Sequence, residues 1–223
     1  VIVTTSGGVV GGDRLRFEIG ATAGCVATVT TQAAEKIYRA AGANSEIDVT
    51  VSAQNCEFLE WMPQETILFD GARLRRRTRL ELHGTARVLA GEIVVFGRRA
   101  RDEKFTYGFL HDDWRVFQDG RLVWADAMHL NGDIGAGIAN VHAFDGAAAV
   151  ATAVYCAPDA AACLEAARDL IGPGGASCVD GILVVRLVNA DAAALRADFA
   201  QFWKMFRYET AGLPAILPRV WEV

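Results

Sequence analysis

Residues 114–124 read Trp-Arg-Val-Phe-Gln-Asp-Gly-Arg-Leu-Val-Trp, and this stretch decides the fold class of the chain. Two segments of extended-type residues flank Asp119-Gly120. A two-residue type I′ turn requires positive φ at both central positions, and an Asp-Gly pair adopts it readily. The stretch therefore predicts a tight β-hairpin.

The same period of two recurs through the first two thirds of the chain. Apolar residues alternate with polar ones at Leu15, Phe17 and Ile19 and again at Ile47, Val49 and Val51. Such alternation is typical of half-buried strands. Pairs typical of turns separate these segments: Gly7-Gly8, Gly11-Gly12, Asp70-Gly71, Asn131-Gly132 and Asp145-Gly146. We therefore expect a mainly β fold, with stacked sheets of many short strands, and no linker dividing residues 1–223 into two domains.

Helical patterns are concentrated near the C-terminus. Pro158 precedes a stretch that ends at Gly172 and places apolar residues on one face: Leu164, Ala167, Leu170 and Ile171. Asp191 is suited to cap a second helix, with Leu195, Phe199, Phe202 and Phe206 at helical spacing. Between them, residues 178–188 predict one nearly continuous apolar strand. Residues 32–41 are expected to form a loop or a single helical turn.

Composition excludes several classes of protein. Hydrophobic residues make up 52% of the chain, charged residues 22%, and the formal net charge is −5. An acidic chain lacks the general attraction to phosphate on which nucleic-acid binding depends, so no nucleic-acid partner is expected. The basic run Arg73–Arg79 is interpreted as a solvated strand face, with electrostatic docking as the alternative. Apolar runs such as residues 93–96 and 182–185 have four residues, against roughly 20 for a membrane-spanning helix, so no membrane segment is expected.

Cysteines and histidines give no pattern of a built metal site. The five cysteines are odd in number and widely spaced without a C-x-x-C pair, which favours a reducing compartment such as the cytoplasm. The four histidines occur singly, without the spacing of a zinc site. The cysteines are Cys25, Cys56, Cys156, Cys163 and Cys178, and the histidines are His83, His111, His129 and His142.

What remains is a set of carboxylates among apolar residues: Glu35, Glu60, Glu65, Asp70, Glu92, Asp113 and Asp126. Buried carboxylates cost several kcal/mol unless they are paired, protonated or metal-bound. Salt bridges are one explanation. Weak oxygen ligands for a transiently held divalent ion are another, because thiolates or several imidazoles would bind nickel too tightly for release. An all-β carbohydrate-active enzyme using Glu60 and Glu65 would need them about 5 to 9 Å apart in an open cleft.

Two long strings resemble the signature segments of one family. They are Thr-Gln-Ala-Ala-Glu-Lys-Ile-Tyr-Arg at residues 31–39 and Leu-Glu-Trp-Met-Pro-Gln-Glu-Thr-Ile-Leu-Phe-Asp-Gly-Ala at residues 59–72. The glycine-rich residues 5–13, Val-Phe-Gly-Arg at 95–98 and Leu-Pro-Arg-Val-Trp at 217–221 agree with it. The chain resembles the UreD (UreH) family of urease accessory proteins over nearly its whole length. An ordinary β-sandwich binding module would make these matches a coincidence.

The resemblance implies a non-catalytic scaffold with no tightly bound cofactor, through which nickel passes transiently. It implies work in the cytoplasm with UreF and the GTPase UreG on apo-urease, and a homodimer within that complex. It also implies an internal tunnel, for which the candidate lining carboxylates are Glu35, Glu65, Asp70, Glu92 and Asp13. Family members carry further N-terminal residues, so a single UreD-like domain lacking its first strands is expected.

The helix after Asp191 has more aromatic residues than one buried face requires. Phe202, Trp203 and Phe206 are therefore candidates for a partner contact, because aromatic residues are enriched at protein interfaces. The alternative, and the favoured one, is simple burial in a core.

Overall fold

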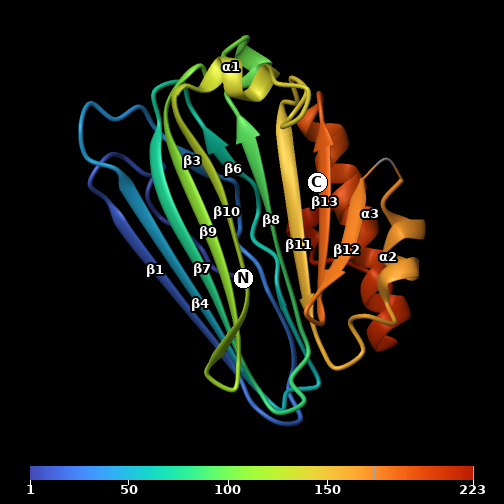
Figure 1. The fold of residues 1–223 in the computed structure, drawn as a ribbon. Coiled ribbons are helices and arrows are strands. Elements are labelled where there is room, and N and C mark those ends of the chain that lie inside the picture. The colour runs from blue at the N-terminus through green and yellow to red at the C-terminus, as the bar shows by residue number, and fades with distance from the viewer. Residues whose placement is uncertain (173, 223) are drawn as a thin grey trace.

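Two stacked β-sheets, with helices on the outer face of one of them, make up the computed structural model, which describes residues 1–172 and 174–222 (Figure 1). The five-stranded sheet contains β1 (Arg14–Ala21), β4 (Ser45–Gln54), β7 (Arg73–His83), β9 (Tyr107–Gln118) and β10 (Arg121–Asp133). The eight-stranded sheet contains β2 (Val26–Val29), β3 (Glu35–Ile37), β5 (Phe58–Trp61), β6 (Thr66–Leu68), β8 (Val88–Phe96), β11 (Ala149–Cys156), β12 (Gly175–Val179) and β13 (Ile182–Asn189). The α-helices are α1 (Ile134–Ala139), α2 (Leu164–Leu170) and α3 (Ala192–Ala211), and the 3-10 turns are η1 (Arg99–Arg101) and η2 (Arg219–Trp221). The expected mainly β fold with two C-terminal helices is confirmed.

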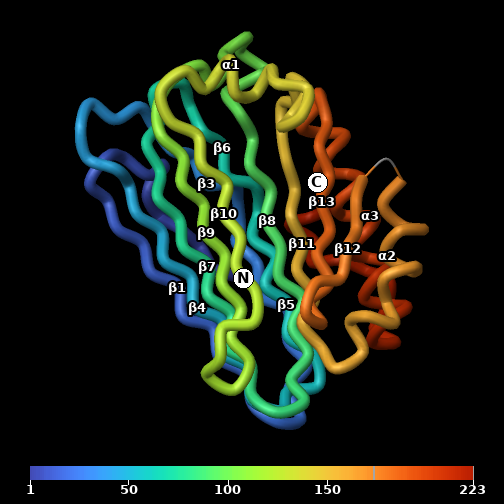
Figure 2. Tube along the Cα trace, viewed as in Figure 1, coloured from blue at the N-terminus to red at the C-terminus, as the bar shows by residue number. Residues whose placement is uncertain are grey.

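The chain winds from one sheet to the other and back, as the tube in Figure 2 makes clear. β1, β4, β7 and β9 are parallel neighbours, so that Arg14 pairs with Glu46, Glu46 with Arg75, and Arg75 with His111. β2, β5 and β8 repeat this parallel arrangement in the other sheet. The result is a β-solenoid-like stack. The alternating sequence pattern fixes which residues face inward, but not whether neighbouring strands run parallel.

The hairpin predicted from residues 114–124 is confirmed. Asp119 and Gly120 have φ of 51° and 81°, and Gln118 pairs with Arg121 at the ends of β9 and β10. The turn expected at Asn131-Gly132 is wrong, because β10 continues to Asp133 and both residues remain paired with β9. Tertiary pairing with a long neighbouring strand outweighs the local turn preference here.

The C-terminal third also follows its predicted helices. The Asp191 carboxylate accepts hydrogen bonds from the backbone N–H groups of Ala193 and Ala194 at the start of α3. The single strand expected at residues 178–188 is wrong: Asp180 and Gly181, with φ of 50° and 80°, divide it into the β12–β13 hairpin. Residues 32–41 contain β3, which pairs with β6, and no helical turn.

The eight-stranded sheet is covered on both faces. One face packs against the five-stranded sheet, and the other packs under α2 and α3 (Figure 1). Every residue of β8 and of β11 is buried. Gly91 in β8 lies so close to α3 that an added Cβ would be 2.7 Å from Phe199 Cζ, so the sheet accepts the helix there only because Gly91 has no side chain.

The aromatic residues of α3 form the core of this second layer. Phe202, Trp203 and Phe206 are each at most 1% exposed. They lie in one cluster with Phe199 and with Trp221 from the C-terminal segment. The structure therefore corrects the expectation of a partner contact: these side chains have no free surface, and burial in a core accounts for the surplus of aromatic residues.

Glu60 connects α3 to the sheet by charge. Its carboxylate accepts hydrogen bonds from Arg207 Nε and Nη2, both at 2.9 Å, and from Trp203 Nε1 at 2.6 Å. The Thr28 hydroxyl donates to the same carboxylate. Glu60 has no exposed surface and Arg207 is also buried. Because water cannot stabilise either charge, each depends on the opposite charge of the other.

We expect Glu60→Ala to lower the free energy of unfolding by about 3–5 kcal/mol, because it leaves the Arg207 guanidinium buried without its counter-charge. Chemical denaturation measures the change. Glu57→Ala is the matched control, since Glu57 lies three residues away with an exposed side chain, and its effect should stay within about 0.5 kcal/mol. Equal effects of the two variants would show that the Glu60–Arg207 pair does not stabilise the fold.

Candidate functional site

A buried arginine joins the two sheets at the middle of the molecule. Arg76 belongs to β7, and its Nε donates to Asp112 Oδ1 of β9 at 3.0 Å. Its Nη1 donates to the Thr66 hydroxyl of β6 at 2.9 Å, and its Nη2 lies 2.7 Å from Glu92 Oε2 of β8. Arg76 and the two carboxylates are all at most 6% exposed. A cation and two carboxylates thus share a site between the sheets.

Glu92 is the unusual member of this group. Burial raises the pKa of Glu92 to about 8, against the lowering effect of the neighbouring Arg76 charge, and Asp112 raises it further. Trp114 Nε1 donates to Glu92 Oε1 at 2.8 Å and fixes its orientation. One guanidinium cannot compensate two carboxylates in a dry site. The shift favours a protonated form of this carboxylate pair over two ionised carboxylates.

Three cavities share lining residues, and the second and third have lining residues from both sheets. The first, of about 120 Å³, lies between the glycine-rich residues 4–8 and residues 32–36 and includes Glu35. The second, of about 40 Å³, contains Glu35, Arg76 and Glu92. The third, of about 480 Å³, extends from Glu92 to the exposed His142. Glu35 is common to the first two cavities and Glu92 to the last two.

Glu35 occupies the junction nearer the N-terminus. It is the first residue of β3, where its backbone N–H donates to the Glu65 carbonyl oxygen at 2.8 Å. Partial burial raises the pKa of the Glu35 carboxyl above its ordinary value. The structure thus places two of the five predicted corridor carboxylates, Glu35 and Glu92, on cavities that share them as lining residues.

The other three predicted carboxylates lie elsewhere. Glu65 borders a separate cavity at the start of α3 and pairs with Arg196 at 3.4 Å. Asp70 accepts hydrogen bonds from the backbone N–H and the hydroxyl of Thr106, each at 2.8 Å. Asp13 accepts from the backbone N–H of Val10 at 2.9 Å. The corridor role of these three residues stays a prediction, which their positions do not strengthen.

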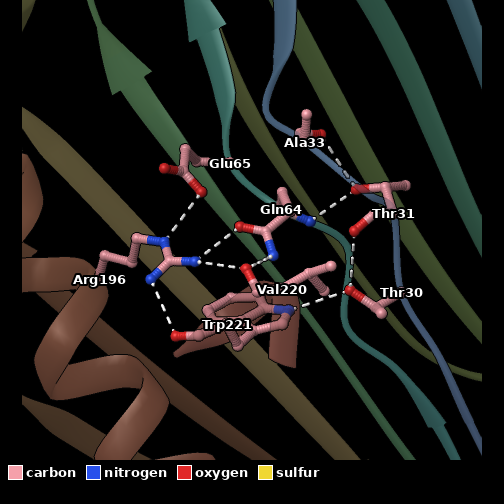
Figure 3. A network of polar contacts seen from close by, with 8 residues as sticks. All are labelled: Thr30, Thr31, Ala33, Gln64, Glu65, Arg196, Val220 and Trp221. Atoms are coloured by element: carbon pink, nitrogen blue, oxygen red, sulfur yellow. Dashed lines mark hydrogen bonds and ion pairs between the residues drawn. The ribbon is translucent and has the colours of Figure 1, made fainter. Parts of the chain in front are cut away.

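The network around Glu65 holds the C-terminal segment against the sheet (Figure 3). Arg196 Nη2 donates to Gln64 Oε1 at 2.8 Å and to the Val220 carbonyl at 3.2 Å. Trp221 Nε1 reaches the Thr30 hydroxyl at 3.0 Å. These contacts join α3, η2 and the segments that precede β3 and β6, which gives Glu65 a structural partner.

The positions of Glu60 and Glu65 exclude the paired-carboxylate hydrolase. Glu60 has no exposed surface and is occupied by Arg207 and Trp203, and Glu65 is paired with Arg196. A glycosidase needs both carboxylates free in one open cleft. Neither carboxylate is available to act as acid or nucleophile.

Sequence reasoning missed Arg76 and Asp112. Four arginines of the basic run do lie on the polar face of β7, but Arg76 shares the buried face with Leu74 and Thr78. Asp112 likewise follows the alternation of Leu110 and Trp114 on β9. The alternation could have predicted both residues. A charged residue at a position of the pattern that is otherwise apolar faces the core, and there it needs a partner of opposite charge.

The metal-ligating capacity of the site is low. Within residues 1–172 and 174–222, no group of three or more His, Cys, Asp or Glu side chains is arranged to hold a metal ion. The same part of the chain contains no helix with the length and apolar character needed to cross a membrane. The fold and these cavities define a β-solenoid-like scaffold with buried charged residues on cavities between its sheets.

Comparison with known proteins agrees with this description. The family model described as "UreD urease accessory protein" matches residues 1–222. The urease accessory protein UreD of Magnetococcus marinus is 44% identical over 232 residues, which cover 100% of this chain and 80% of that protein. UreD of Xanthobacter autotrophicus is 45% identical, covering 99% and 76% of the two chains, and UreD of Azorhizobium caulinodans is 42% identical, covering 100% and 82%. The chain belongs to the UreD family of urease accessory proteins.

Membership of this family settles the class of function. UreD proteins are non-catalytic chaperones that take part in the nickel activation of urease. The interpretation as an accessory protein is therefore confirmed, and the two alternatives, a carbohydrate-active enzyme and an unrelated binding module, are wrong.

The raised pKa of Glu92 has a consequence for stability. The folded state holds this proton more tightly than the unfolded chain, whose glutamate has the ordinary pKa of 4.5. The resulting stabilisation is fully present below pH 4.5 and is lost as pH rises to about 8. We expect the stability of Glu92→Gln relative to the parent chain to rise through this window by up to about 1.4 kcal/mol per pH unit.

Urea unfolding at several pH values measures this difference. Glu57→Gln is the control, because an exposed glutamate should give a difference that hardly changes with pH. A constant difference for Glu92→Gln across the window would mean that Glu92 ionises like an ordinary surface carboxyl.

Proposed function

We propose that nickel on its way to urease passes between the two sheets, past Glu35 and then Glu92, or in the opposite order. The observation that carries this proposal is that neighbouring cavities share a carboxylate: Glu35 borders the first and second, and Glu92 borders the second and third. Both carboxylates are held where any ion that follows this route must meet them.

The chemistry of the narrow cavity suits transit more than storage. About 40 Å³ holds roughly one to three waters, so an ion there must exchange part of its hydration shell for protein oxygen atoms. Carboxylate and hydroxyl oxygens from Glu35, Thr66 and Glu92 line this cavity, and an ion would compete with Arg76 and Trp114 for those of Thr66 and Glu92. Oxygen donors hold nickel less tightly than thiolates or imidazoles, which permits release.

Arg76 and the Glu92 proton regulate this passage in the proposal. A divalent ion at Glu92 displaces the proton, because a ligating carboxyl must be deprotonated. The fixed positive charge of Arg76 lies 2.7 Å from the same carboxylate and limits how strongly the ion is held. The proton then returns when the ion leaves, and the site regains its neutral form.

The assembly follows from the family role. UreD proteins belong to the urease accessory machinery. We infer that the partners of this chain are UreF, the GTPase UreG and apo-urease, that the chain forms a homodimer within the complex, and that the complex works in the cytoplasm. We also infer that residues 1–223 act as one domain, because the two sheets share a core.

The test is nickel loading of urease by the complete accessory system. The full gene carrying Glu92→Gln is co-expressed with the urease structural genes and the other accessory genes, and nickel is measured in the purified urease. We expect about tenfold less nickel than with the parent gene, because the amide cannot supply an anionic ligand. Glu35→Gln should lower loading in the same direction.

Glu57→Gln is the matched control and should load urease normally. Thermal unfolding of each purified variant separates a lost passage from a lost fold. Full loading of urease by a Glu92→Gln, Glu35→Gln double variant would sink the proposed route. Unchanged loading when the whole gene is omitted would overturn the accessory role itself.

A further inference from the structure

Two histidines lie directly opposite each other on the solvent side of the five-stranded sheet. His111 of β9 and His129 of β10 are cross-strand partners in the antiparallel register. Their Nδ1 atoms are 3.3 Å apart, and their rings meet edge to face with centroids 5.4 Å apart. The neighbouring Asp112 faces inward to Arg76, so the histidine pair lies on the opposite face from the Glu92 site.

The separation of the two nitrogens matches a metal chelate. Nitrogen ligands lie about 2.0–2.1 Å from a bound transition metal, and at a tetrahedral angle two of them are about 3.3 Å apart. Without a metal, one neutral imidazole must donate a long hydrogen bond to the other, and two protonated rings would repel each other. The same separation fits a hydrogen bond between neutral rings in the empty pair and two nitrogen ligands on one shared cation.

The surrounding side chains hold this geometry. Phe109 meets the His129 ring edge to face, with centroids 5.5 Å apart. Asp113 Oδ2 lies 4.0 Å from His111 Nε2, the nitrogen that points away from His129, and Arg115 holds that carboxylate at 2.9 Å. Metal-bound histidines commonly direct their second nitrogen to a carboxylate, which orients the ring and raises its basicity.

The arginine in register with His111 on the neighbouring strand is directed toward Phe109. Arg75 pairs in register with His111, but its guanidinium lies over the Phe109 ring, 5.6 Å from the centroid. The His111 side chain retains 25% exposure and His129 is exposed, so an ion from solvent can reach both Nδ1 atoms. Asp113 supplies negative charge on the same face.

We propose that His111 and His129 form a surface site for a divalent transition metal, bound through both Nδ1 atoms with water in the remaining positions. Imidazole ligands suit Ni²⁺, Zn²⁺ and Cu²⁺ and disfavour Mg²⁺ and Ca²⁺. With two protein ligands the site is open and exchanges its ion readily. His129 also borders the third cavity, but the histidine site differs from the Glu92 site in its ligands, and it does not depend on the proposal for Glu92.

The test is titration of the full chain with NiCl₂, followed by X-ray absorption at the nickel edge, which detects imidazole ligands directly. We expect about one equivalent of nickel with two imidazoles in the parent chain. His111→Gln and His129→Gln should each abolish that equivalent. Gln replaces the exposed rings without adding charge, and thermal unfolding verifies that each variant is folded.

His83→Gln is the matched control, because His83 is a partly exposed strand histidine that lies beside Asp119 and not beside another histidine. It should leave nickel binding unchanged, as should Glu92→Gln if the two sites are separate. Absence of imidazole-ligated nickel in the parent chain, or its persistence in the His111→Gln, His129→Gln double variant, would overturn the proposal. Urease loading by Glu92→Gln tests the other proposal alone.

Discussion

Burial of the eight-stranded sheet on both faces is the constraint on which the rest of the structure depends. The five-stranded sheet covers one face and the helices α2 and α3 cover the other, so that β8 and β11 have no exposed residue. Any charged side chain on these strands must find its partners inside the protein. Glu92 on β8 and Glu60 on the neighbouring β5 are the two glutamates subject to this demand, and they meet it on opposite faces of the sheet.

The two buried glutamates have the same functional group but different surroundings. Glu60 faces α3, where Arg207, Trp203 and Thr28 occupy its oxygen atoms and make it a structural ion pair. Glu92 faces the other sheet, where it competes with Asp112 for one arginine. Both carboxylates have donors on both oxygen atoms, but Glu92 also borders two of the cavities and has a raised pKa, so it can exchange its proton for a cation. The difference makes Glu92 the candidate functional residue and Glu60 part of the framework.

The UreD family explains why a scaffold would contain such a passage. Its members serve the nickel activation of another protein, so the chemistry required of them is reversible contact with an ion. The two sites proposed above, carboxylates between the sheets and a pair of imidazoles on the surface, would differ in strength and accessibility, and neither has the closed coordination that would retain nickel. Both lie on strands of the same rigid stack, and these strands fix the spacing of their side chains.

The sequence by itself determined the local elements: the Asp119-Gly120 hairpin, the Asp191-capped helix, the mainly β class and, through its long matching strings, the family. Each depends on residues close together in the chain, where turn, cap and periodicity preferences act. Only the tertiary structure decided that neighbouring strands run parallel, that Arg76 meets Asp112 and Glu92, and that Glu35 but not Asp70 borders the cavities. The physical reason is that alternation assigns a residue to a face, whereas the register between strands some 30 residues apart selects its partner across that face.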